Sequence, residues 1–139
     1  MKLLDVNGNL KKRNVEKYRI KWDEKSRSKI QFETKQFLKQ FWFSHIVYEE
    51  FPVFGTKMKV DIINFTKKIA IEVQGNQHNT FNPFFHDNRL YNWRQSIKRD
   101  MVKLEWLELN EITVVEILED EIKLLSKEFF KNRFDIDLI

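Results

Sequence analysis

Two acidic residues, Asp61 and Glu72, lie in neighbouring runs whose composition predicts the two strands of a hairpin, Lys59–Phe65 and Ile69–Gln74. Side chains alternate between the faces of a strand, so Glu72 and Gln74 share one face of the second strand. If Asp61 stands opposite Glu72, two carboxylates meet on the same face of the hairpin. Paired carboxylates of this kind bind divalent cations or take part in acid–base chemistry.

The turn between the strands decides whether the two acids meet. A two-residue turn at Thr66-Lys67 sets Asp61 directly opposite Glu72, and a longer turn makes them diagonal neighbours or breaks the match. At about 5 Å and an effective dielectric near 20, the repulsion is roughly 3 kcal/mol. A cation such as Mg²⁺ would offset it. The alternative is an exposed polar sheet face on which neighbouring lysines neutralise the two acids.

Glu33 is a third candidate acid. It lies three residues after Ile30 and four before Phe37, on the apolar stripe of a predicted helix. A carboxylate rarely faces a core without a partner. Glu33 is therefore expected either to reach the same metal cluster as the other two acids or to pair with a lysine at the edge of the stripe.

The surrounding elements follow from periodicity and turn signals. Asn7-Gly8-Asn9 predicts a small hairpin, and Tyr18–Trp22 alternates as a short strand or extended arm would. The other elements are a helix from Ser26 or Ser28 to about Trp42, strands at 46–50, 59–65, 69–74 and 112–118, and helices at 87–107 and 119–131. We expect an apolar stripe on the long helix, made of Leu90, Trp93, Ile97, Met101 and Leu104. This order predicts an α/β fold with a mixed four-stranded sheet flanked by helices.

Composition limits the class of protein. The 139 residues suit one compact domain, which we place at 26–139 after a basic N-terminal arm at 1–25. Cysteine is absent, which excludes disulfides, thiolate metal sites and cysteine nucleophiles. We find neither a membrane-spanning apolar run nor a signal peptide, so an intracellular, cytoplasmic protein without a membrane partner is expected.

Charge is unevenly distributed along the chain. Residues 1–104 carry 21 Lys and Arg against 11 Asp and Glu, a net +10, whereas residues 105–139 carry 4 against 10, a net −6. A basic front of this kind predicts a polyanion such as DNA as the partner. The residues expected in this footprint are Lys11, Lys12, Arg13, Arg19, Lys21, Arg27 and Lys29. Tyr18 and Trp22 could stack on bases or serve as packing residues.

A family resemblance joins these observations. Asp61, followed after ten residues by Ile71-Glu72-Val73-Gln74-Gly75, resembles the motif of the PD-(D/E)XK nuclease superfamily. The segment from Glu72 to His78, with the later Asp100-Met101-Val102-Lys103, is similar to the branch of very-short-patch-repair and phage or homing endonucleases. The resemblance covers roughly residues 28–118 and implies a restriction-endonuclease-like core in the order α-β-β-β-α-β.

The resemblance implies a metal-dependent endonuclease that hydrolyses DNA. Asp61, Glu72 and the carbonyl of Val73 would ligate Mg²⁺, with Mn²⁺ able to substitute, and Glu33 would hold a second metal or a metal-bound water. Gln74 stands where the family usually has lysine, and it can orient the attacking water but cannot accept its proton. His78 is then a candidate general base or phosphate donor, ahead of His86 and His45. Arg99 and Lys103, on one side of the long helix, would contact the phosphate backbone.

Two other classes stay open. A DNA-binding module with this fold could have lost water activation, with Gln74 as the sign of that loss, and a protein-interaction domain would bind no DNA in a salt-sensitive way. A two-fold homodimer would suit a double-strand break in a palindrome, but the sequence marks no interface.

Overall fold

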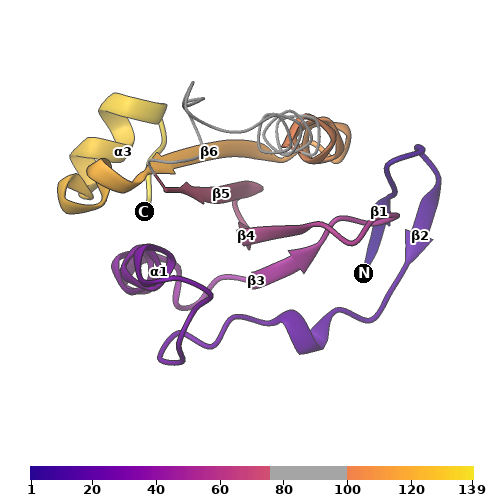
Figure 1. Ribbon diagram of the computed structural model, residues 1–139, viewed down its shortest axis with the longest axis horizontal. Coiled ribbons are helices and arrows are strands. Elements are labelled where there is room, and N and C mark those ends of the chain that lie inside the picture. Colours follow the sequence, from indigo (N-terminus) through magenta and orange to yellow (C-terminus); the bar gives the residue numbers. More distant parts are fainter. Residues whose placement is uncertain (76–99) are drawn as a thin grey trace, which may run out of the picture.

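A four-stranded mixed sheet forms the centre of the computed structural model, which describes residues 1–75 and 100–139 (Figure 1). Its strand order is β3-β4-β5-β6, with β5 and β6 parallel and the other neighbours antiparallel. The strands are β3 (Val47–Pro52), β4 (Lys59–Asn64), β5 (Ile69–Gln74) and β6 (Thr113–Leu118). The predicted α/β class, the mixed sheet and the parallel last strand are confirmed.

Helix α1 (Lys29–Trp42) covers one face of the sheet. It begins where predicted, because the Ser28 hydroxyl accepts the backbone N–H of Gln31 at 3.2 Å and caps the first turn. Leu38 and Trp42 are fully buried and pack with Ile62 and Ile71 of the sheet. This first core packs the second half of α1 against β4 and β5.

The opposite face of the sheet is covered by a helix described over residues 100–109. Trp106 and Leu107 are buried there, whereas Met101 and Leu104, which we predicted to face the core, are 56% and 36% exposed. That part of the predicted stripe is wrong. The helix turns Lys103 toward the sheet instead, a position that an ion pair makes tolerable. The rest of the predicted stripe lies outside the described residues.

A small hairpin, β1 (Lys2–Leu4) with β2 (Leu10–Lys12), packs against the 100–109 helix. Gly8 supplies the positive φ of 83° that its turn needs, as the Asn-Gly signal predicted. The carbonyl of Leu4 accepts hydrogen bonds from the indole of Trp106 at 2.6 Å and the amide of Asn110 at 3.1 Å. The start of the chain thereby fixes the helix that carries Lys103.

The register of β4 and β5 is the one that brings the two acids together. Ile62 pairs with Ile71 and Asn64 with Ile69, so one further step sets Asp61 opposite Glu72. The connection is a four-residue turn over 65–68 that keeps the register predicted for the two-residue turn. The predicted division of faces is also confirmed, since Ile71 belongs to the first core and Ala70 to the second.

Two other predicted elements differ from the structure. The single helix over 119–131 is instead η2 (Glu119–Leu124), a 3₁₀ helix, followed by α3 (Lys127–Phe134). Ser126 causes the break, because its hydroxyl accepts the N–H of Phe129 and begins a new helix. The segment predicted over 18–22 as a short strand or extended arm follows the short η1 (Glu16–Tyr18) and is an extended arm, joined to the sheet by an isolated bridge between Arg19 and Tyr48.

Residues 1–25, predicted as a basic arm, contribute apolar side chains to both cores. Ile20 and Trp22 lie in the first core and Val15 in the second, so Trp22 is a packing residue. The charged side chains between them remain exposed. In the described part of the chain, no helix has the length and apolar character needed to cross a lipid bilayer.

Candidate active site

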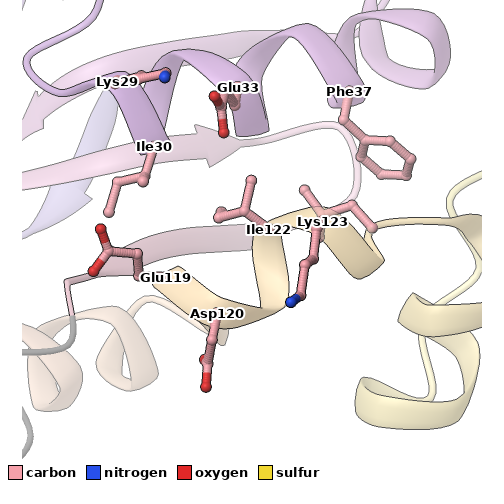
Figure 2. Close-up of a pocket in the computed structure, with 9 residues that line it drawn as sticks. Lys29, Ile30, Glu33, Phe37, Glu119, Asp120, Ile122 and Lys123 are labelled. Carbon is pink, nitrogen blue, oxygen red and sulfur yellow. The ribbon is translucent and has the colours of Figure 1, made fainter.

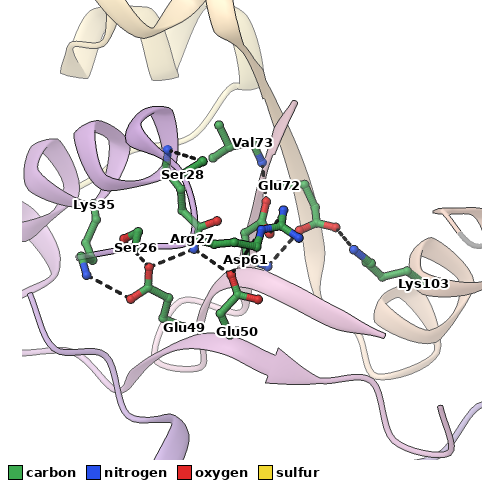
Figure 3. Close-up of polar contacts among 11 residues, drawn as sticks. Ser26, Arg27, Ser28, Lys35, Glu49, Glu50, Asp61, Glu72, Val73 and Lys103 are labelled. Atoms are coloured by element: carbon green, nitrogen blue, oxygen red, sulfur yellow. Dashed lines mark hydrogen bonds and ion pairs between the residues drawn. The ribbon is translucent and has the colours of Figure 1, made fainter. Parts of the chain in front are cut away.

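Asp61 and Glu72 hold each other in place at the point where the β4–β5 ladder ends (Figure 3). The backbone N–H of Asp61 donates to Glu72 Oε2 at 2.9 Å, and the N–H of Val73 donates to Asp61 Oδ2 at 2.9 Å. Both residues are buried, with exposed fractions of 5% and 4%. The side chains thus replace the hydrogen bonds that the ladder would have made, and two carboxylates are fixed side by side.

Two cationic side chains contact the carboxylate oxygens of Asp61 and Glu72 that do not accept these backbone hydrogen bonds. Lys103 Nζ lies 2.5 Å from Glu72 Oε1, and Arg27 Nη2 lies 3.5 Å from Asp61 Oδ1. Lys103 comes from the 100–109 helix and is 16% exposed, whereas Arg27 comes from the loop before α1 and is 68% exposed. The pair of acids is therefore bounded by one largely buried cation and one exposed cation.

Burial and mutual repulsion change the acidity of Asp61. Its pKa is raised from the ordinary 3.8 to about 7, first by burial and second by the charge of Glu72. The Val73 N–H, Arg27 and Lys103 act in the opposite direction. Asp61 consequently exchanges a proton near neutral pH, and any cation that binds at Asp61 competes with that proton.

A third carboxylate, Glu50, lies next to Asp61. The pairing of β3 with β4 skips these two residues, between Glu49 with Ile62 and Phe51 with Val60. Glu50 has a positive φ of 52°, a conformation that L-residues other than Asn and Asp seldom adopt. The alternation of side chains between the two faces of the sheet is interrupted at these residues. On β3, Val47 lies in the first core and Phe51 in the second, and on β4, Ile62 lies in the first core and Val60 in the second. Strained residues of this kind cluster at functional sites.

A buried polar network supports Glu50 from α1 (Figure 3). The Gln31 amide donates to Glu50 Oε1 at 3.1 Å and to Glu49 Oε2 at 2.9 Å. Lys35, with no exposed side-chain surface, contacts Glu49 Oε1 at 3.0 Å and donates to the carbonyls of Lys21 and Glu24. The Ser26 hydroxyl completes the set with a bond to Glu49 Oε2 at 2.6 Å. This network anchors the loop that carries Arg27 to the first helix.

The two acids, Glu50 and the two cations that contact the acids line a cleft of about 700 Å³. Its chemistry is mixed, with four carboxylates and four cationic side chains around the ends of β4 and β5. The lining consists of Arg27, Glu50, Lys57, Met58, Lys59, Asp61, Glu72, Val73, Gln74, Asp100 and Lys103. An anion would meet the cations of this cleft, and a hard cation would meet its oxygens.

The structure brings some of the predicted site residues into this cleft and not others. Gln74 lines it, as Asp61, Glu72 and Val73 do. Glu33 does not, because it is exposed on α1 and lines a separate groove with Glu119 and Lys123 (Figure 2). The expectation that Glu33 joins the other two acids is not met in this structure, since an exposed carboxylate at the edge of the stripe keeps its hydration.

The predicted DNA contacts divide in the same way. Arg27 and Lys103 lie in the cleft, whereas the other described members of the footprint lie elsewhere. Lys11 and Lys12 are exposed on β2, Arg13 stacks over Phe54, Arg19 over Tyr48, Lys21 pairs with Glu24, and Lys29 borders the groove of Glu33. His78, His86 and Arg99 lie outside the described residues. His45 contacts the Asn64 amide at 3.0 Å, away from the cleft.

Four charged residues of the cleft were not predicted as site residues, namely Glu50, Lys57, Lys59 and Asp100. A signal existed for two of them. Lys59 lies two residues before Asp61 on the same strand, and Asp100 lies three residues before Lys103 on the same helix. The backbone conformation of Glu50 has no local sequence signal, since neither glycine nor asparagine stands there.

The donor atoms of the cleft suit a magnesium ion. Two buried carboxylates that repel each other, Asp61 and Glu72, present the oxygen ligands that Mg²⁺ takes. Their outer oxygens are in contact with Arg27 and Lys103, so an entering metal would compete with those cations. Within residues 1–75 and 100–139, no group of three or more His, Asp or Glu side chains stands ready to hold a metal. The donor chemistry fits Mg²⁺ at a site of two protein carboxylates.

Comparisons with known proteins give one sequence match of note. An uncharacterized protein, 033L, of Invertebrate iridescent virus 3 is 32% identical over 66 residues, which is 48% of this chain and 34% of the viral protein. The chain therefore spans about a third of the length of that curated relative. No family model matches the chain. No solved structure matches it either.

Proposed function

We propose that this protein is a divalent-metal-dependent endonuclease that hydrolyses DNA phosphodiester bonds, with a restriction-endonuclease-like core of the PD-(D/E)XK type. The observation that carries the proposal is the buried pair of Asp61 and Glu72, fixed at neighbouring strand ends in a cleft that also holds Arg27 and Lys103. Acids that can hold a metal and cations that can bind a phosphate are the groups that metal-dependent hydrolysis of a phosphodiester uses.

In this proposal Asp61 and Glu72, with the Val73 carbonyl, would hold Mg²⁺ or Mn²⁺. The bound metal would lower the pKa of an attacking water and neutralise charge on the phosphate. Gln74 lines the cleft beside Glu72 and orients the water through its amide. The water oxygen would bond to phosphorus as the water gives up one proton to solvent, one P–O ester bond would break, and the leaving oxygen would take up a proton from solvent, giving a phosphomonoester and an alcohol.

DNA enters the cleft along its cationic side chains. Arg27 is exposed and holds Asp61 at 3.5 Å, beyond the usual length of a charge-assisted hydrogen bond, so a phosphate can replace that contact. The basic surface of residues 11–29 adds longer-range attraction, which salt screens. A phage or homing endonuclease is the biological setting that we favour, and a mismatch or repair nickase is the next.

A specific observation favours a second candidate, a DNA-binding module without cleavage. The outer oxygens of both acids are engaged by Lys103 and Arg27, and the family's usual lysine is replaced by Gln74. In that case the acids hold the two cations in place for phosphate binding and no metal enters.

A plasmid-nicking assay in Mg²⁺ and Mn²⁺, paired with metal-binding calorimetry, distinguishes the two candidates. We expect nicking by the wild type and none by Glu72→Gln, which keeps the shape of the side chain but loses its charge. Glu116→Gln is the matched control, because Glu116 pairs with Glu72 across β5 and β6 yet is exposed. DNA binding without metal uptake or nicking selects the binding module. Equal cutting by wild type and Glu72→Gln removes Glu72 from the mechanism.

A further inference from the structure

Lys103 has a partner that the sequence did not predict. We expected it on one side of the long helix, as a contact to the DNA backbone near the scissile bond, and in the structure its Nζ lies 2.5 Å from Glu72 Oε1. The neighbouring Gln74 carries no charge and cannot supply a cation to the same point. The cleft therefore has a largely buried ammonium group beside Glu72, and this group comes from the 100–109 helix and not from β5.

The rigidity of this ammonium separates it from the other cations of the cleft. Lys103 is 16% exposed, whereas Arg27 is 68% exposed and Lys57 and Lys59 are exposed as well. One turn further along the helix, Trp106 and Leu107 are buried, and the Trp106 indole is bonded to the Leu4 carbonyl. A charge that is held in advance and partly shielded from water stabilises developing charge better than a solvated one.

We propose that Lys103 is a catalytic residue of the nuclease, whose ammonium group binds the reacting phosphate and supplies the positive charge that Gln74 lacks. The inference rests on the proposed function. In this role Lys103 forms no covalent bond. Its ammonium exchanges the Glu72 oxygen for a phosphate oxygen, and the interaction strengthens as negative charge builds up on that oxygen in the transition state.

The test measures the single-turnover rate of plasmid nicking at saturating DNA for Lys103→Gln. In this variant the introduced side-chain amide can still donate a hydrogen bond to the Glu72 carboxylate, so Glu72 is not left without a partner. Thermal unfolding verifies that the variant is folded. We expect a rate about 100-fold lower, the usual loss when one oxyanion donor is removed. Lys123→Gln, in the separate groove of Glu33, removes the same charge far from the site and is expected to nick normally.

Moving the charge within the cleft provides the decisive variant. Gln74→Lys combined with Lys103→Gln places the ammonium on β5, and we expect it to recover most of the lost rate. DNA affinity measured without metal gives an independent readout, because loss of one phosphate contact lowers the slope of log K against log salt by about 0.9.

The outcomes separate the two proposals. If wild type nicks and Lys103→Gln nicks equally fast at saturating DNA, the inference is wrong and the nuclease stands. If Lys103→Gln is slow but Gln74→Lys does not restore it, Lys103 acts by holding Glu72, and the inference is again wrong. If wild type neither takes up metal nor nicks, the nuclease proposal fails and this inference fails with it.

Discussion

Asp61→Asn should stabilise the protein at alkaline pH and leave its stability nearly independent of pH in the range where the wild type loses stability. The folded pKa of Asp61 is about 7 against 3.8 in the unfolded chain, so the folded state holds a proton that the unfolded state releases. A raised carboxyl pKa means that stability falls as pH rises from 3.8 and levels off above 7. At about 1.4 kcal/mol for each pKa unit, full ionisation costs the fold roughly 4 kcal/mol.

The part of this cost that appears between pH 5 and pH 8 can be measured by urea unfolding. Somewhat under half of this cost is already present at pH 5, which leaves roughly 2–3 kcal/mol for the wild type to lose on going to pH 8. The carboxamide that replaces the Asp61 carboxyl in the variant would still accept the Val73 N–H and would not repel Glu72. We therefore expect the stability difference between variant and wild type to grow by roughly 2–3 kcal/mol over that range.

Glu116→Gln serves as the control. It also removes a carboxylate, but Glu116 is exposed on β6, where it pairs with Glu72. Its stability should follow the wild type at both pH values. The reasoning would be refuted by a difference between Asp61→Asn and wild type that stays constant from pH 5 to pH 8. That result would mean that burial and Glu72 do not hold a proton on Asp61.

Two further predictions concern the metal and the buried lysine. At pH 8, Mg²⁺ at 100 times its Kd should raise the unfolding free energy of the wild type by about 2.7 kcal/mol, as measured by thermal unfolding. The rise should be far smaller for Asp61→Asn. An equal rise in both proteins would mean that the ion binds elsewhere. Lys35→Met should lower the unfolding free energy by about 3–5 kcal/mol, because Glu49 loses its buried partner. Lys39→Met, which breaks the exposed pair with Asp23, should cost under about 1 kcal/mol in the same urea titration, and similar losses in both variants would contradict the burial argument.

Hydrophobic periodicity and capping predicted the sheet and the first helix well. The strand runs and the Ser28 cap depend on interactions within a few residues. The sequence left open whether Asp61 and Glu72 meet, because only a two-residue turn was expected to set them opposite each other. The observed four-residue turn keeps that register, so the two acids do meet.

Long-range contacts account for the predictions that failed. An apolar stripe could not show that Lys103 faces the sheet while Met101 and Leu104 are exposed, because its ion-pair partner Glu72 comes from a strand 31 residues away. The conformation of Glu50 likewise depends on Gln31 and Arg27, which reach it from another element. Glu33 was predicted to join the other two acids because it lies on the apolar stripe of the first helix. Such a stripe shows which side of the helix faces the sheet, but not which end of the sheet each residue lies near.

The bonds from Trp106 and Asn110 to Leu4 link positions more than a hundred residues apart in sequence. During synthesis, the first hairpin must wait for most of the polypeptide to leave the ribosome before it can make these contacts. Such distant closures are slow, because loop entropy is lost before the contacts form. The cleft should thus form late in folding, since the helix that carries Lys103 docks on the first hairpin through contacts between positions far apart in the chain.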